Sequence, residues 1–107
     1  MLSDSKALSR LKKKLTIENL WLYIIKILID EKKPLKAYDV KVRLRERFGI
    51  NPPAVTVYTV VYRMHREGLL AKRSVKDETF YEPTSKGIDS FSQGVVFLEE
   101  IVSKLKI

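Results

Sequence analysis

Cysteine is absent from the 107-residue chain, so disulfides, thiolate metal ligands and a cysteine nucleophile are all excluded. This absence suits a reducing interior, and we expect a cytoplasmic protein. Long apolar runs are also missing, since the longest stretch, Leu20–Ile29, is interrupted by Lys26 and is too short to span a bilayer. No apolar segment precedes a small-residue cleavage site near the start, so no cleavable signal is expected.

Groups that carry catalysis or hold cofactors are scarce. The single histidine, His65, has no metal-ligand residue types near it in the sequence. Glu99 and Glu100 occupy successive helix positions, which do not face each other, so they are a poor acid–base pair. Neither a glycine-rich phosphate loop nor a nucleophile–base constellation is visible. We therefore expect no enzyme, no metal and no cofactor.

Positive charge is in excess. The chain has 21 Lys and Arg against 13 Asp and Glu, giving a formal net charge of +8. Such an excess favours a polyanionic partner, either nucleic acid or an anionic membrane surface. A hydrophobic content of 45% is sufficient for a folded core, and the length fits one domain.

The stretch Asn51–Leu69 organises the chain. Pro52-Pro53 suits a helix entrance, and Gly68 can adopt the left-handed conformation that ends many helices. Apolar residues at helical spacing predict a core face, and a second stripe is polar and then cationic. The β-branched run Val55–Val57 leaves a strand as the alternative. The core face is Val57, Val60, Val61 and Met64, and the polar stripe is Thr56, Thr59, Arg63 and Arg66.

Two further helices are predicted before this stretch. One begins with Thr16 as its cap and runs to about Asp30; it is apolar nearly all round and must be covered from more than one direction. Another spans about Ala37–Phe48, after a short strand at Leu35, and ends at Gly49. Residues 1–14 form a basic amphipathic lead-in, for which a frayed, solvated terminus is the alternative.

After Gly68 the hydrophobic period changes to two. Leu69–Val75 and Thr79–Pro83 predict a β-hairpin joined by Lys76-Asp77-Glu78, with Tyr81 inward and Phe80 on the other face. Two helices joined by a tight turn, followed by a basic hairpin, give the order of a winged helix over residues 15–84. The expected fold class is α+β, mostly α: three helices and a two-stranded wing, followed by a C-terminal helix.

That last helix, Ser85–Lys106, is capped by Thr84 and carries an apolar seam with spacings of 3, 4, 3, 4 and 3 residues. Phe97 and Ile101 widen the seam, which favours a partner helix from a second copy over residues 85–107. The exposed side of the first long helix is the expected docking place; the alternative is a helix folded back on its own domain. The expected dimer interface comprises Trp21, Ile25, Ile88, Phe91, Val95, Leu98, Val102 and Leu105.

Three segments stand out by their order and spacing: Pro34–Val40 (PLKAYDV), Thr56–Leu69, with TVY, RM and EGL in order, and Phe80–Gly87 (FYEPTSKG). Together they resemble the PadR-like family of winged-helix transcription regulators. The resemblance covers roughly Leu15–Ser90, and its departures are Lys36-Ala37 for His-Gly, Thr59 for proline and Tyr62 for arginine. It implies a DNA-binding regulator whose C-terminal helix mediates dimerisation.

A winged helix of this kind places its recognition helix, about Pro53–Glu67, in the major groove. Residues near the helix start approach bases, while tyrosines and cations hold phosphates. Asp77 and Glu78 repel phosphate, so the wing tip is expected to stay out of the groove. The expected DNA-binding residues are Lys36, Tyr38, Pro53, Ala54, Thr56, Tyr58, Thr59, Tyr62, Arg63, Arg66, Lys72, Arg73 and Lys76.

The sequence therefore predicts a homodimeric, sequence-specific regulator that binds double-stranded DNA, with repression as the expected sign of regulation. The alternative is a winged helix used for protein assembly, whose basic surface meets an acidic partner. The family resemblance also permits an apolar pocket at the dimer interface for a planar aromatic effector, near Trp21 and Phe91 or Phe97.

Overall fold

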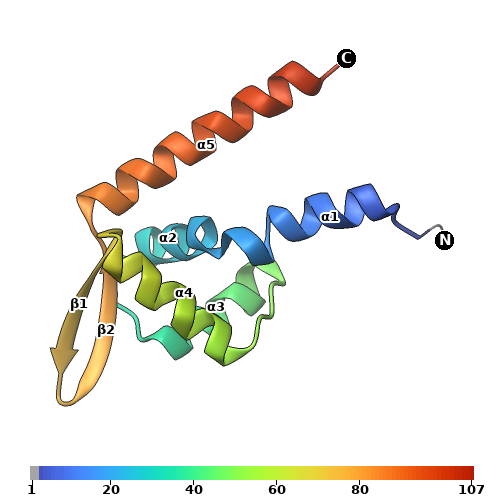
Figure 1. Ribbon diagram of the computed structural model, residues 1–107. Coiled ribbons are helices and arrows are strands. Elements are labelled where there is room, and N and C mark those ends of the chain that lie inside the picture. The colour runs from blue at the N-terminus through green and yellow to red at the C-terminus, as the bar shows by residue number, and fades with distance from the viewer. Residues whose placement is uncertain (1–2) are drawn as a thin grey trace.

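The computed structural model describes residues 3–107, so Met1 and Leu2 of the predicted lead-in lie outside the described residues. Helices α2, α3 and α4 form the centre, a hairpin projects from one side, and α5 runs past α2 (Figure 1). Helix α1 projects toward the same side as the far end of α5 (Figure 1). The elements are α1 (Lys6–Lys14), the 3-10 turn η1 (Ile17–Asn19), α2 (Leu20–Glu31), α3 (Ala37–Phe48), α4 (Ala54–Arg66), β1 (Leu70–Val75), β2 (Glu78–Pro83) and α5 (Ser85–Leu105).

Helix α2 is the centre of the hydrophobic core, as its all-round apolar sequence predicts. It packs against α3, α4, β2 and α5, and five of its side chains are buried. Ile25 is one of them and is fully buried within the chain, so its expected place at a dimer interface is wrong. The buried side chains of α2 are Leu20, Ile24, Ile25, Ile27 and Leu28.

The start of α2 also differs from the prediction. The Thr16 hydroxyl makes no capping bond; it donates to the Lys12 carbonyl and so closes the end of α1. The chain then forms the short turn η1 before α2 begins at Leu20. Threonine commonly makes this back-bond to the carbonyl four residues earlier, and here it replaces a cap.

The predicted bounds of α3 are confirmed at both ends, and Gly49 follows in the left-handed conformation with φ of 66°. Pro53 caps α4, whose residues Val57, Val61 and Met64 are buried, so the helical interpretation of this stretch is confirmed. Helix packing against α2 and α3 outweighs the weak helix propensity of its β-branched residues.

The hairpin is antiparallel and pairs Lys72 with Tyr81 and Arg73 with Phe80. Its turn contains only Lys76 and Asp77, both with positive φ, because β2 begins at Glu78 rather than at Thr79. The predicted short strand at Leu35 is a single bridge to Tyr81. Three helices and this two-stranded wing form a winged-helix fold.

Helix α5 is capped as predicted, since the Thr84 hydroxyl accepts from the Gly87 amide. Its first half packs on α2, where Gly94 allows the Leu22 and Trp21 side chains to approach closely. Across residues 3–107, no helix has both the length and the apolar character that crossing a bilayer requires.

Candidate nucleic-acid interface

The exposed face of α4 is the first part of the candidate interface. Side chains at positions 55, 59, 62 and 66 recur at helical spacing opposite the buried face, and all four are exposed. Val55, at the start of the helix, is 70% exposed, although sequence reasoning did not include it. Its phase with Thr59 was the signal that could have found it. We call Val55, Thr59, Tyr62 and Arg66 the α4 outer face.

The chemistry of this face changes along the helix. The Thr59 hydroxyl donates to the Val55 carbonyl at 2.9 Å, so Thr59 presents a methyl group and an acceptor oxygen outward. The Arg66 guanidinium lies 5.8 Å from the centre of the Tyr62 ring, which holds the cation over an aromatic face. Within residues 3–107, Arg66 forms no ion pair, so its charge is available to a ligand.

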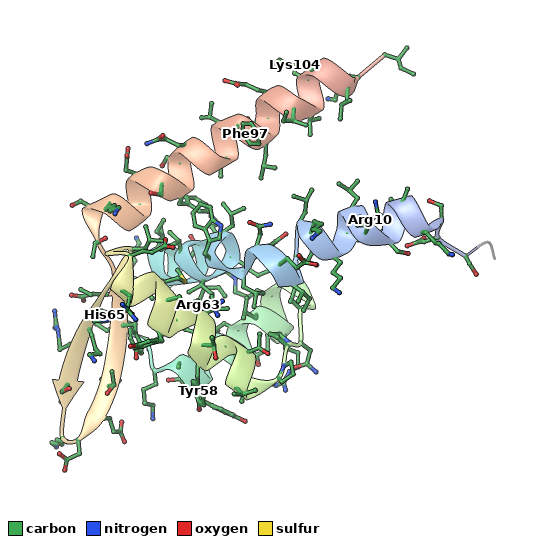
Figure 2. All side chains as sticks on the ribbon, viewed as in Figure 1. Arg10, Tyr58, Arg63, His65, Phe97 and Lys104 are labelled. Atoms are coloured by element: carbon green, nitrogen blue, oxygen red, sulfur yellow. The ribbon has the colours of Figure 1, made fainter. Side chains whose placement is uncertain are left out.

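A tyrosine-lined groove borders this face where α3, α4 and β2 meet. Tyr38 and Tyr58 are 57% and 48% exposed, and Tyr58 lies on the side of α4 away from α2 (Figure 2). Lys36 lines the same groove, but its ammonium is 3.4 Å from the Glu78 carboxylate. Three tyrosines and a lysine that is paired with Glu78 thus line one groove beside the outer face. The groove is lined by Lys36, Ala37, Tyr38, Tyr58, Thr79 and Tyr81.

The start of α4 also reaches the surface. Pro53 is exposed, and Ala54 and Thr56 are half-buried. Because Pro53 caps the helix without a side-chain bond, the first-turn amides are not covered by a capping side chain. This end of α4 can therefore approach a ligand closely.

Arg63 lies on the opposite flank from Tyr58, between α4 and α2 (Figure 2). It borders a hollow of about 540 Å³ together with Glu18, Trp21 and Glu67. Neither of the phenylalanines expected near an effector lines this hollow: Phe91 packs against the core, and Phe97 is exposed. Trp21 thus lines a hollow with α4 residues, while the other side of its environment is α5 at Gly94.

The wing does not present its cations together. Adjacent strand residues point to opposite faces, so Lys72 shares the face of Tyr81, while Arg73 shares that of Phe80. The Arg73 guanidinium also bonds the Glu82 carboxylate at 3.0 Å. Lys76 occupies the exposed turn. Of the three wing cations, Lys72 alone projects from the face that carries Tyr81, a residue of the groove.

A second surface lies along α5, where apolar side chains remain exposed. Phe91 and Leu98 are half-buried, as is Trp21 on α2. The rest of the predicted seam is exposed, and Phe97 widens it at 59% exposure. The alternative of a helix folded back on its own domain thus applies only to the first half of α5. The exposed seam residues are Ile88, Val95, Val102 and Leu105.

These features define a winged-helix protein with an additional N-terminal helix and a long C-terminal helix. No protein-family model and no curated protein matches the chain. Solved structures share the fold. A PadR-like transcription factor from Bacteroides fragilis matches with a TM-score of 0.72 and 21% identity, covering 94% of this chain and 96% of that one.

Two more solved structures are similar. The winged-helix DNA-binding protein F93 from STIV matches with a TM-score of 0.70 and 21% identity, over 81% of this chain and 94% of its own. A PadR family transcription regulator from Clostridium difficile matches with a TM-score of 0.65 and 22% identity, over 78% and 94%. At these identities the similarity establishes the fold.

Proposed function

We propose that this chain is a PadR-like regulator of transcription that binds double-stranded DNA as a homodimer in the cytoplasm and acts as a repressor. The observation that carries the proposal is the α4 outer face, which combines an exposed helix start, an arginine that makes no ion pair within residues 3–107, and a bordering tyrosine groove. The names of the structural neighbours, which describe DNA-binding proteins and transcription regulators, support the same function.

The proposed binding mode places α4 in the major groove. Val55 and Thr56 lie near the helix start, where apolar side chains can meet the thymine methyl group. Arg66 and the tyrosine hydroxyls lie farther out, where phosphates pass. Lys72 is the wing cation best placed to contact the backbone, because Arg73 is already paired with Glu82. A palindromic site occupied in this way would block transcription by exclusion.

The test is a titration of duplex DNA across a salt series. Neutralising six or more phosphates per dimer gives a slope of log affinity against log salt of about −5 or steeper. Arg66→Ala is expected to weaken binding to all sequences and to reduce that slope by about two per dimer, one per protomer. Lys104→Ala is the matched control, because it removes one cation at the far end of α5 (Figure 2). A flat slope would contradict DNA binding.

A basic surface that serves protein assembly would give a different result. In that case an acidic protein would bind this chain at moderate salt, whereas duplex DNA would not. Arg66, which has no ion-pair partner in the described part of the chain, and the exposed tyrosines favour DNA, because both residue types hold phosphate oxygens well.

The proposed homodimer forms through the exposed seam of α5. Val102 is 51% exposed and contributes nothing to the buried core, so Val102→Asp is expected to give a folded monomer in sedimentation experiments. Two copies held this way would present their α4 helices to major-groove faces about 34 Å apart. A wild-type chain that is monomeric at micromolar concentration would contradict this part.

An aromatic effector has a specific candidate site. The hollow beside Trp21 has a volume of about 540 Å³, within the range of small-molecule pockets. Arg63 and Lys86 border this hollow together with Glu18 and Glu67, so its lining is charge-balanced and the aromatic ring of Trp21 is the feature that a planar aromatic compound would meet. Quenching of the single tryptophan by such a compound, with a saturable dependence on concentration, is the expected result.

A further inference from the structure

The wing carries no net charge, although the chain as a whole has a formal charge of +8. Between Leu70 and Pro83 three cations are balanced by three carboxylates, so the excess positive charge lies entirely in the other elements. A carboxylate near phosphate weakens binding, so each one lowers the affinity of this hairpin for DNA. The cations are Lys72, Arg73 and Lys76, and the carboxylates are Asp77, Glu78 and Glu82.

Two of these carboxylates are paired with cations, in different places. The Glu82 carboxylate bonds Arg73 within the wing at 3.0 Å. Glu78 reaches out of the wing instead, and its carboxylate lies 3.4 Å from the ammonium of Lys36. Lys36 directly precedes α3 and lines the tyrosine groove that borders the α4 outer face. Glu78 therefore neutralises a cation that belongs to the candidate interface.

The backbone keeps the two members of this pair close together. Leu35 and Tyr81 exchange two hydrogen bonds, of 3.0 and 2.8 Å, which tie the chain entering α3 to β2. Glu78 is the first residue of the same strand and directly follows the two-residue turn. The pair can therefore form and break through rotation of the two side chains, without any movement of the wing.

The pair is also exposed enough to change partners. The Lys36 and Glu78 side chains are 44% and 55% exposed, and an ion pair between such groups contributes little to stability. A phosphate in the groove would offer the ammonium a comparable negative charge, and Tyr38 and Tyr58 supply hydroxyl donors beside it. A phosphate that enters the groove can thus replace the carboxylate, whereas a more distant phosphate meets a neutralised lysine.

We propose that Glu78 is a specificity-determining residue: it keeps Lys36 neutralised on unmatched DNA and releases it to a phosphate when α4 is seated in a matching major groove. The proposal rests on the proposed function. The groove borders the α4 outer face, so only a fully seated helix brings a phosphate into it. Glu78 thus lowers the affinity for unmatched duplex and raises the discrimination between sequences.

The first test measures the affinity of the full chain for two duplexes by fluorescence anisotropy. The selected duplex is recovered from a random pool by the wild-type chain, and the scrambled duplex has the same composition in a different order. Glu78→Gln is expected to tighten binding to the scrambled duplex about three- to tenfold and to steepen its salt slope by about two per dimer. Binding to the selected duplex should change less than twofold, because Lys36 already contacts phosphate there.

The matched control removes the same charge elsewhere. Glu100, in the outer half of α5, is exposed and forms no ion pair within residues 3–107. Glu100→Gln should change neither affinity more than twofold. If Glu78→Gln changes neither affinity, or tightens binding to both duplexes equally, the proposal is wrong.

The second test asks whether the effect of Glu78 depends on Lys36. The double variant Lys36→Gln, Glu78→Gln has the net charge of the wild-type chain. It is expected to bind the scrambled duplex within about twofold of wild type, and to bind the selected duplex at least threefold more weakly, because the Lys36–phosphate contact is lost. A double variant that binds the scrambled duplex as tightly as Glu78→Gln does would overturn the exchange of partners.

This role and the proposed function fail in different ways. A wild-type chain that recovers no duplex from the pool removes the proposed function and the role of Glu78 together. A wild-type chain that prefers the selected duplex, with a preference that Glu78→Gln leaves unchanged, removes only the role of Glu78.

Discussion

The junction between α4 and α5 is where one added methyl group is expected to have the largest effect on stability. Gly87 lies in the first turn of α5 and is buried. A Cβ at this position would lie 2.2 Å from the Leu69 carbonyl oxygen and 3.2 Å from Cδ1 of Ile25. Gly87→Ala therefore forces α5 and the backbone at Leu69 apart.

The loss of stability depends on how firmly hydrogen bonds hold the two segments of the junction in place. Carbon and oxygen approach to about 3.3 Å at closest, so the two segments must separate by about 1 Å. The Leu69 carbonyl cannot retreat freely, because it accepts a bond from the Thr84 amide at 3.1 Å. Overpacking costs about 1–3 kcal/mol or more, and alanine returns about 1 kcal/mol through helix propensity. Because the clash is with a backbone oxygen, the cost lies at the upper end, about 3 kcal/mol, so the expected net loss is about 2 kcal/mol, or roughly 10 °C in melting temperature.

The assay is thermal and urea unfolding at fixed protein concentration, followed by circular dichroism. Gly94→Ala in the same helix is the control, because its Cβ would meet only side-chain ends of Leu22 and Trp21, at 3.2 and 3.3 Å. That variant should stay within about 1 kcal/mol of wild type. If Gly87→Ala is as stable as Gly94→Ala, then α5 and the backbone at Leu69 are not in fixed contact.

Three more substitutions test the cap at this junction, the wing turn and an ion pair between α2 and α3. Thr84→Ala removes the cap on Gly87 and the bond to the Gly68 carbonyl, and should lower the unfolding free energy by about 1–2 kcal/mol in urea. Asp77→Gly places glycine at a positive φ of 64° in the wing turn, and the same measurement should show a gain of about 0.5–1 kcal/mol. The hydrogen bond from Arg47 lowers the pKa of Asp30 in the folded protein below its ordinary value of 3.8. The contribution of ionised Asp30 to the free energy of unfolding is therefore complete above pH 3.8 and is lost as the pH falls through the lower, folded-state pKa. Asp30→Asn should accordingly flatten the acid limb of an unfolding curve; an unchanged acid limb would contradict the assignment.

A fourth variant concerns sequence preference. Val55→Ala shortens the exposed side chain at the start of α4, so it should reduce the preference for thymine at one operator position several-fold. Total affinity for nonspecific duplex should stay unchanged, because no charge is altered. Selection from a random duplex pool measures both quantities, and a uniform loss across all sequences would argue against base contact.

Local signals in the sequence predicted most of the fold. The bounds of α3, the end of α4 near Gly68 and the cap of α5 each depend on residues within one turn of the boundary. Such signals are available in a single sequence because capping and positive φ are properties of the local backbone. The seam on α5 was also visible, since its spacing extends over most of the helix.

The errors arose where tertiary packing decides. The Thr16 hydroxyl can accept a bond as the cap of a following helix, or it can donate a bond to an earlier carbonyl. Only the turn of the chain at η1 selects the bond to the Lys12 carbonyl. Ile25 belongs to a helix that is apolar on all sides, so the sequence could not tell its buried face from its exposed one. Val55 is a different case, because its helical phase with Thr59 was visible in the sequence and its 70% exposure in the structure agrees with that phase.

The junction also connects the two proposed surfaces mechanically. Thr84 bonds both the end of α4, through the Gly68 carbonyl, and the start of α5, through the Gly87 amide. The Leu69 carbonyl accepts from the Thr84 amide, and Gly87 packs on that same carbonyl. In the proposed dimer α5 sets the relation between the copies, so this short rigid link would fix the separation of the two α4 helices. A change at Thr84 or Gly87 should therefore alter the preferred half-site spacing even where each α4 outer face remains intact.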